Sequence, residues 1–167
     1  MRAWLLSGQG EPNRAVELMQ AGLREHRGLG TMGISPYYMT LLARAQARTG
    51  ALDEAIFTLD AAVDRAQKAG NAWDEPELLR IRGEFLLEKG NAAEAPEQCF
   101  TGALALARTT SARGWELRAA TALARLWTAQ GRGEEAKALL APVYGSFDDG
   151  LGTLDLEEAR TLLVALP

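Results

Sequence analysis

The amino-acid sequence predicts an all-α fold in which helical hairpins repeat along the chain. Two observations lead to this prediction. A short glycine-led segment returns at spacings of 40, 40 and 41 residues, and the apolar residues between the glycines follow helical spacing. No alternating apolar pattern typical of strands lies between the glycines. We therefore expect almost no β structure.

The repeated segment begins with glycine and ends with alanine. It occupies residues 50–55, 90–95 and 131–136, with a weaker copy at 10–15. Mostly small residues keep step with the alanine, twelve positions before it and seven after it: Ala3, Ala43, Gly83 and Ala124, then Gly22, Ala62, Gly102 and Val143. Small side chains let two helices cross closely, so each repeat indicates a hairpin whose first helix ends at the glycine. We expect burial between the paired helices for the repeat alanines Ala55, Ala95 and Ala136.

Local signals place the hairpins at about residues 1–27, 35–70, 74–109 and 113–145, with a capping helix over 154–166. This arrangement gives about three and a half repeats of roughly 40 residues in one domain spanning residues 1–167. The first hairpin is the incomplete one, because the residues before Gly10 allow only about half of a first helix. We therefore expect either that an upstream part has been lost or that the chain is a fragment of a longer protein.

Several predicted helices begin with residues that are typical of helix N-termini. Ser35 followed by Pro36 predicts the start of the second hairpin, because proline is favoured in the first helical position. Asn91 with Glu94 resembles a capping box for the helix that follows. In the same way, Asp155 and Glu158 predict a cap for the final helix.

Composition and charge exclude several classes of protein. The chain has 167 residues, a formal net charge of −4 and a pI near 5.1, so nucleic acid and anionic membrane surfaces are not expected partners. No segment approaches the length of a membrane span. Cys99 is the only cysteine, which excludes an internal disulfide and favours a cytoplasmic location. Arginine greatly exceeds lysine, which is typical of a GC-rich bacterial genome.

The residues needed for catalysis or metal binding are scarce. The sequence contains no phosphate-binding loop, and His26 and Cys99 are its only histidine and cysteine. We interpret His26 as a charge near a helix end and Cys99 as a buried core residue at the position of Leu59 and Leu140. The acidic stretch from Asp148 lacks the alternation of a calcium loop. No enzyme activity, cofactor or metal is predicted, and the four tryptophans are interpreted as packing residues.

The small residue, the glycine turn and the following alanine resemble the tetratricopeptide (TPR) pattern, although the period here is longer than in that family. Residues 77–87 and 115–127, together with 131–136, are similar to the degenerate repeats at the C-terminal end of bacterial predicted ATPases fused to class III adenylate or guanylate cyclases. This resemblance implies a TPR-like right-handed superhelix. It also implies a non-catalytic protein-interaction scaffold or, alternatively, the regulatory arm of a cyclase or signalling ATPase in signal transduction.

The expected partner is a protein or peptide, or an upstream domain of a longer protein. First-helix residues that would face the inner groove are the candidate contacts: Tyr37, Arg44, Arg48, Arg80, Glu84, Arg118 and Arg125. Arg80 and Glu84 could instead pair along one helix. A second candidate is an apolar association edge formed by Trp4, Leu5 and Leu6, which would dock a preceding domain or support a homo-oligomer.

Overall fold

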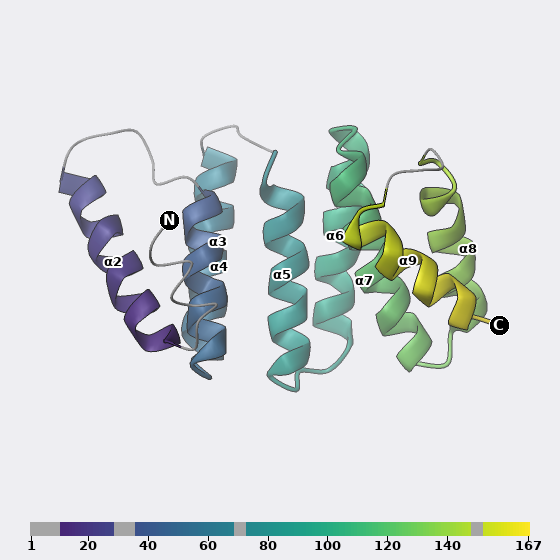
Figure 1. Ribbon diagram of the computed structural model, residues 1–167, viewed down its shortest axis with the longest axis horizontal. Helices are drawn as coiled ribbons and strands as arrows, with labels where there is room; N and C mark the ends of the chain where they lie inside the picture. The colour runs from purple at the N-terminus through teal and green to yellow at the C-terminus, as the bar shows by residue number, and fades with distance from the viewer. Residues whose placement is uncertain (1–10, 29–35, 69–72, 148–151) are drawn as a thin grey trace. The chain divides into compact units, whose positions relative to one another are not determined.

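The computed structural model describes residues 11–28, 36–68, 73–147 and 152–167, which form eight α-helices (Figure 1). No β-strand occurs in these ranges, and the predicted all-α fold is confirmed. The helices divide into two compact units, residues 1–74 and 75–167, and each unit is described by itself. The single domain expected over residues 1–167 stays a prediction.

The first unit contains α2 (Pro12–Gly28), α3 (Pro36–Arg48) and α4 (Leu52–Lys68). Helices α3 and α4 pair as a hairpin, and α2 packs against α3. Small residues dominate the interface between α3 and α4, where Ala43, Ala55 and Ala62 are fully buried. The buried hydroxyl of Thr58 donates a 2.8 Å hydrogen bond to Oε1 of Gln46 and ties the two helices of the hairpin together.

The second unit contains α5 (Glu75–Glu88), α6 (Glu94–Thr109), α7 (Arg113–Ala129), α8 (Gly133–Tyr144) and α9 (Leu154–Ala165). Helices α5 and α6 form one hairpin and α7 and α8 form the next, with α7 also packed against α5 and α6. The last helix, α9, packs on α7 and α8 and crosses α7 obliquely (Figure 1). The buried cluster of this unit includes the large side chains of Phe100, Leu117, Leu123 and Leu140.

The first helix of each hairpin ends as the repeated glycine predicts. Gly50, Gly90 and Gly131 have φ angles of 84°, 87° and 79°, which place them in the left-handed region that favours glycine. After α3, the amide of Gly50 donates to the carbonyl of Ala47, and the amide of Ala51 donates to that of Gln46. The same two bonds follow α5 and α7, so all three helices end in a Schellman motif.

The buried face of α6 differs from the prediction by one residue. Ala55 and Ala136 are fully buried as expected, but Ala95 is only half-buried, and the fully buried position is Pro96. In the same way Phe100, rather than Cys99, lies at the position of Leu59 and Leu140, although Cys99 is itself buried. The predicted alignment of α6 with the other second helices was therefore wrong.

Two predicted caps were also wrong. The N-cap residue of α6 is Ala93, which makes no side-chain capping bond, so Asn91 and Glu94 form no capping box. The final helix is capped by Thr153, whose hydroxyl accepts a 3.4 Å hydrogen bond from the amide of Leu156. Asp155 instead lies inside the first turn of α9, and its carboxylate is available for a contact with another helix.

Candidate functional site

The predicted contact residues fall into both units. Tyr37, Arg44 and Arg48 lie on one exposed stripe of α3 in the first unit, at positions i, i+7 and i+11. The side chain of Tyr37 is 57% exposed, and its ring makes an edge-to-face contact with Tyr38 at 5.8 Å between centroids. Arg44 and Arg48 also interact within the chain. This stripe offers an aromatic group followed by two guanidinium groups.

In the second unit, a chain of ion pairs links three helices. We call it the α5–α7–α9 network and define it by Glu84, Arg80, Glu77, Arg118 and Asp155. At its centre, Nε and Nη2 of Arg80 donate to the two carboxylate oxygens of Glu77 at 2.7 and 2.9 Å. Arg80 also donates through Nη1 to Glu84, so the pairing of these two residues along one helix is observed. Each of the three nitrogens of the Arg80 guanidinium therefore donates to a carboxylate.

The central pair of the network is almost completely buried. The side chain of Arg80 is only 10% exposed and that of Glu77 only 11%. Burial alone would lower the pKa of Arg80, but hydrogen bonds and charge attraction from Glu77 and Glu84 outweigh it, and the net effect raises the pKa. Removing either partner would leave a buried charge without compensation. The side chain of Arg80 is therefore held against Glu77 and Glu84 and is little accessible to a ligand.

Arg118 joins α5 to α9. Its Nη1 donates to Glu77 at 3.2 Å, and its Nε donates to Asp155 of α9 at 2.7 Å. The guanidinium also lies 5.0 Å from the ring centroid of Trp115. With 36% of its side chain exposed, Arg118 is the most accessible guanidinium of the network. It lies where α9 crosses α7.

The last predicted residue, Arg125, lies two turns further along α7. Its Nη2 donates to Glu158 of α9 at 3.0 Å, and both side chains are about half exposed. A shallow hollow of about 450 Å³ lies beside this pair and is lined by Arg125 and by residues of α9. Both arginines predicted on α7 thus contact acidic residues of the final helix, which occupies the surface that they would offer to a partner.

A second polar cluster lies on α6 and the turn between α7 and α8. Glu97 accepts hydrogen bonds from Nε1 of Trp127 at 2.7 Å and from Nη1 of Arg132 at 3.0 Å. Both bonds lower the pKa of Glu97, and the bond from Trp127 is the larger cause of this shift. Arg132 stacks on the Trp127 ring at 4.4 Å and pairs with Glu135, whose hydrogen bonds are the largest cause of a raised pKa for Arg132. We call these four residues the Glu97 cluster.

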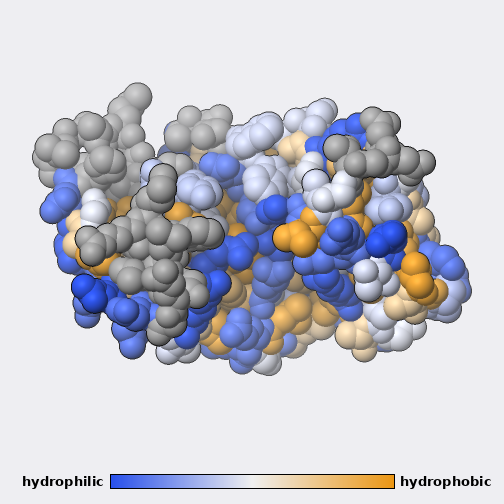
Figure 2. Space-filling view, in the orientation of Figure 1, coloured by the Kyte–Doolittle hydropathy of each residue, from blue (hydrophilic) through white to orange (hydrophobic). Residues whose placement is uncertain are grey.

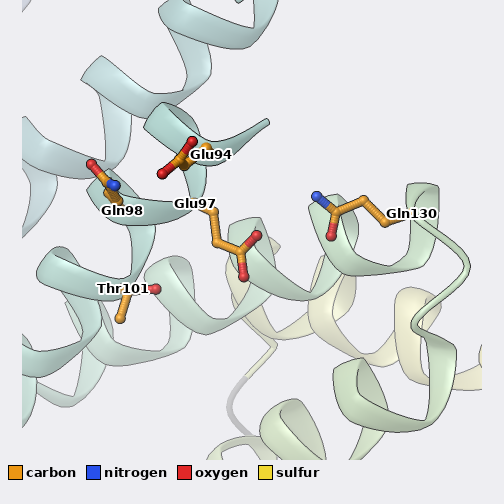
Figure 3. Close-up of a pocket in the computed structure, with 5 residues that line it drawn as sticks. All are labelled: Glu94, Glu97, Gln98, Thr101 and Gln130. Carbon is orange, nitrogen blue, oxygen red and sulfur yellow. The ribbon is translucent and has the colours of Figure 1, made fainter. Parts of the chain in front are cut away.

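An open polar hollow of about 630 Å³ adjoins the Glu97 cluster (Figure 3). Its lining consists of Glu94, Glu97, Gln98 and Thr101 from α6, with Gln130 from the end of α7. In Figure 3, Glu97 points toward the end of α7 that carries Gln130. Because the Glu97 carboxylate is already used to join neighbouring helices, we interpret this cluster as a structural junction.

Sequence reasoning found the arginines of the α5–α7–α9 network but missed their partners on α9. Asp155 and Glu158 were both interpreted as parts of a helix cap, because contacts separated by more than thirty residues leave no local pattern. The i,i+3 spacing of Glu77 and Arg80 could have revealed the central pair. The prediction that the tryptophans are packing residues was wrong for Trp73, because this residue is 60% exposed.

Trp4, Leu5 and Leu6, the predicted association edge, lie outside the described residues. Within the residues that the structure does describe, no group of three or more histidine, cysteine, aspartate or glutamate side chains could hold a metal ion. Over the same part of the chain, no helix is long and apolar enough to cross a membrane.

Comparison with solved structures identifies the fold. A putative kinesin light chain with nearly identical TPR-like repeats from Podosopora anserina matches with a TM-score of 0.73 and 19% identity, over 98% of this chain and 81% of that chain. A point variant of that protein gives a TM-score of 0.74 at 20% identity, over 98% and 80% of the two chains. BtubC (BKLC) from P. vanneervenii gives a TM-score of 0.77 at 16% identity, over 98% and 68%.

These similarities define the class. The chain is an all-α protein of TPR-like fold, and at such low identity the similarity establishes the fold alone. No protein-family model matches the sequence, and no curated protein gives a significant match. The resemblance to bacterial ATPase and cyclase proteins has therefore gained no support from these comparisons.

Proposed function

We propose that the chain is a non-catalytic protein-interaction scaffold of the TPR type. The observation that supports this function most directly is the similarity to TPR-like repeat structures over 98% of the chain. Stacked helical repeats present long surfaces built from successive first helices, and proteins of this architecture use them to bind other proteins. The exposed stripe of Tyr37, Arg44 and Arg48 on α3 fits such a role.

The chemistry of the second unit agrees with this proposal. The arginines and acids of the α5–α7–α9 network are engaged with one another, and the guanidinium of Arg80 donates three hydrogen bonds to the carboxylates of Glu77 and Glu84. A general base or nucleophile needs a side chain whose reactive atom faces substrate rather than a structural partner. Binding through shape and charge therefore suits this surface better than catalysis.

Affinity purification with matched variants tests the scaffold function. Tagged wild-type chain and the double variant Tyr37→Ala/Arg44→Ala are compared in extracts of the host organism by quantitative mass spectrometry. Phe57→Ala serves as the control, because Phe57 is also an aromatic residue of the first unit and its side chain is 75% exposed. We expect at least one partner that is lost with the α3 variant and retained with the control. Identical partner sets for all three chains would contradict binding through α3.

The finer resemblance, to the regulatory arm of a cyclase or signalling ATPase in the bacterial cytoplasm, remains the alternative proposal. It rests on the sequence of residues 77–87, 115–127 and 131–136. Sequencing the genomic region upstream of Met1 would test it, since a reading frame for an ATPase or cyclase domain should lie there. An unrelated upstream gene would leave the independent scaffold as the better proposal.

A further inference from the structure

The final helix, α9, is attached to the second unit by a narrow apolar stripe. Leu156 and Ala159 are the buried residues of the helix, Leu166 is buried just beyond it, and Leu162 and Leu163 pack against the core while partly exposed. These residues belong to the same buried cluster as Leu140 and Val143 of α8. Helices α5 to α8 occur in hairpin pairs, whereas α9 has no such partner among the described residues. A single helix of this length is marginal without tertiary contacts.

Charge complementarity defines how α9 lies on α7. Arg118 and Arg125 stand seven residues apart on one face of α7, and Asp155 and Glu158 stand three residues apart on α9. The α9 segment carries three acidic residues and one basic residue, Arg160. The four side chains of these ion pairs are 33% to 56% exposed, and ion pairs that are this accessible to water add little to stability. The pairs therefore orient α9 more than they hold it.

We propose that the face of α7 and α8 under α9 is a docking site for an acidic amphipathic helix of a partner protein. In the absence of that partner, α9 occupies the site. This inference rests on the proposed scaffold function and deepens it, because it names the surface and the chemistry of the ligand. The partner helix must carry a carboxylate, an apolar residue directly after it, and a second carboxylate one turn later, as Asp155, Leu156 and Glu158 do in α9.

Displacement of α9 follows from its contacts. A partner helix with the same charges but a longer apolar stripe would gain more buried area on α7 and α8 than α9 offers. It must also exceed the advantage that α9 has through its covalent attachment. A partner helix that binds tightly therefore displaces α9, whereas a helix that binds weakly does not.

The test uses a fluorescent peptide with the sequence of residues 152–167 as the probe, titrated into full-length protein and followed by anisotropy. In the variant Asp155→Lys/Glu158→Lys, the chain's own α9 faces the arginines with like charges and should leave the site. We expect the probe to bind this variant at least about tenfold more tightly than the wild type, the equivalent of about 1.4 kcal/mol. Adding Arg125→Glu to the variant should reverse most of that gain.

A charge-matched control separates docking from general attraction. The variant Glu134→Lys/Glu157→Lys changes the net charge equally at two exposed positions that form neither of the two pairs, and it should bind the probe as the wild type does. A folded Asp155→Lys/Glu158→Lys chain, with helical circular dichroism retained, that binds the probe no better than this control would overturn the proposal. A wild-type dimer in light scattering that the same double variant abolishes would also overturn it, in favour of α9 from a second copy. Neither result affects the α3 test of the scaffold function.

Discussion

Helices α6 and α8 follow the same type of glycine turn but bury different positions of the repeat. The first intrahelical bond of α8 ends at the carbonyl of Arg132, one residue after Gly131, whereas that of α6 ends at Ala93, three residues after Gly90. As a result, α8 buries Ala136 and α6 buries Pro96. The repeat that begins at Gly90 is one residue longer than the others, and the extra residue is accommodated in its turn.

This difference shows which part of the repeat is constrained. The small residues of the first helices keep their register, since Ala43, Gly83 and Ala124 are all buried. The turn after the glycine absorbs an insertion because its backbone is exposed and few contacts fix its length. Glycine spacing therefore locates the turn reliably, but it does not fix the register of the helix that follows.

The largest expected effect tests the register directly. Ala136→Leu would add bulk at a fully buried position, and we expect a loss of about 1–3 kcal/mol in the free energy of unfolding. Ala95→Leu, at the same distance from its glycine, should change stability by less than about 0.5 kcal/mol, because Ala95 is half-buried. Urea unfolding of both variants gives the comparison. Equal losses would mean that α6 and α8 share one register after all.

A second test addresses the close crossing of α5 and α6. A methyl group at Gly83 would lie 2.5 Å from Cε1 of Phe100, whose side chain is almost completely buried. Despite the better helix propensity of alanine, we expect Gly83→Ala to destabilise the protein by about 1 kcal/mol or more.

Gly102→Ala is the matched control on α6, since its methyl group would meet Leu79 at an ordinary 3.7 Å. Here helix propensity should prevail, with a gain of up to about 1 kcal/mol. Chemical denaturation followed by circular dichroism distinguishes the two signs. A stabilising Gly83→Ala would show that Phe100 moves aside freely, and the packing of α6 would then be looser than its buried cluster indicates.

The third test concerns the ionic junction that ties α6 to the α7–α8 turn. Hydrogen bonds from Trp127 and Arg132 lower the pKa of Glu97 below its ordinary value of 4.5 in the folded state. The unfolded chain therefore binds a proton at higher pH than the folded chain does, and stability rises with pH in this range. The contribution is complete above pH 4.5 and is lost as the pH falls through the folded pKa.

Glu97→Gln removes the titration and keeps an oxygen that can accept from Trp127. Wild type should have the higher urea midpoint at pH 6, and the difference should shrink between pH 5 and pH 3. A constant difference across this range would mean that the Glu97 charge does not contribute to the junction.

Much of the fold was predictable because its signals are local. The glycine turns depend on a backbone conformation that one residue type favours, and helix starts such as Pro36 depend on the first turn alone. The arginines on α7 were found by repeat register. Their partners Asp155 and Glu158 were not, because the packing of α9 against α7 depends on tertiary contacts far apart in sequence. The register of α6 was missed because one inserted residue can be absorbed at several points of a turn.

The smallest expected effect comes from the turn at the other end of α6. Ser111 has a φ of 54°, and the amides of Ser111 and Ala112 donate to the carbonyls of Arg108 and Ala107. This is the bonding pattern found at Gly50, Gly90 and Gly131, but here a residue with a β-carbon adopts the left-handed conformation.

Glycine would relieve that strain, although its greater freedom in the unfolded chain offsets part of the gain. We expect Ser111→Gly to stabilise the protein by about 0.5 kcal/mol, a rise of about 1–2 °C in the melting temperature. Ser111→Asn should lie between glycine and the wild type, because asparagine tolerates positive φ, while Ser111→Ala should give no gain. Scanning calorimetry of the three variants orders them, and an alanine variant as stable as the glycine variant would show that the β-carbon at position 111 causes no strain.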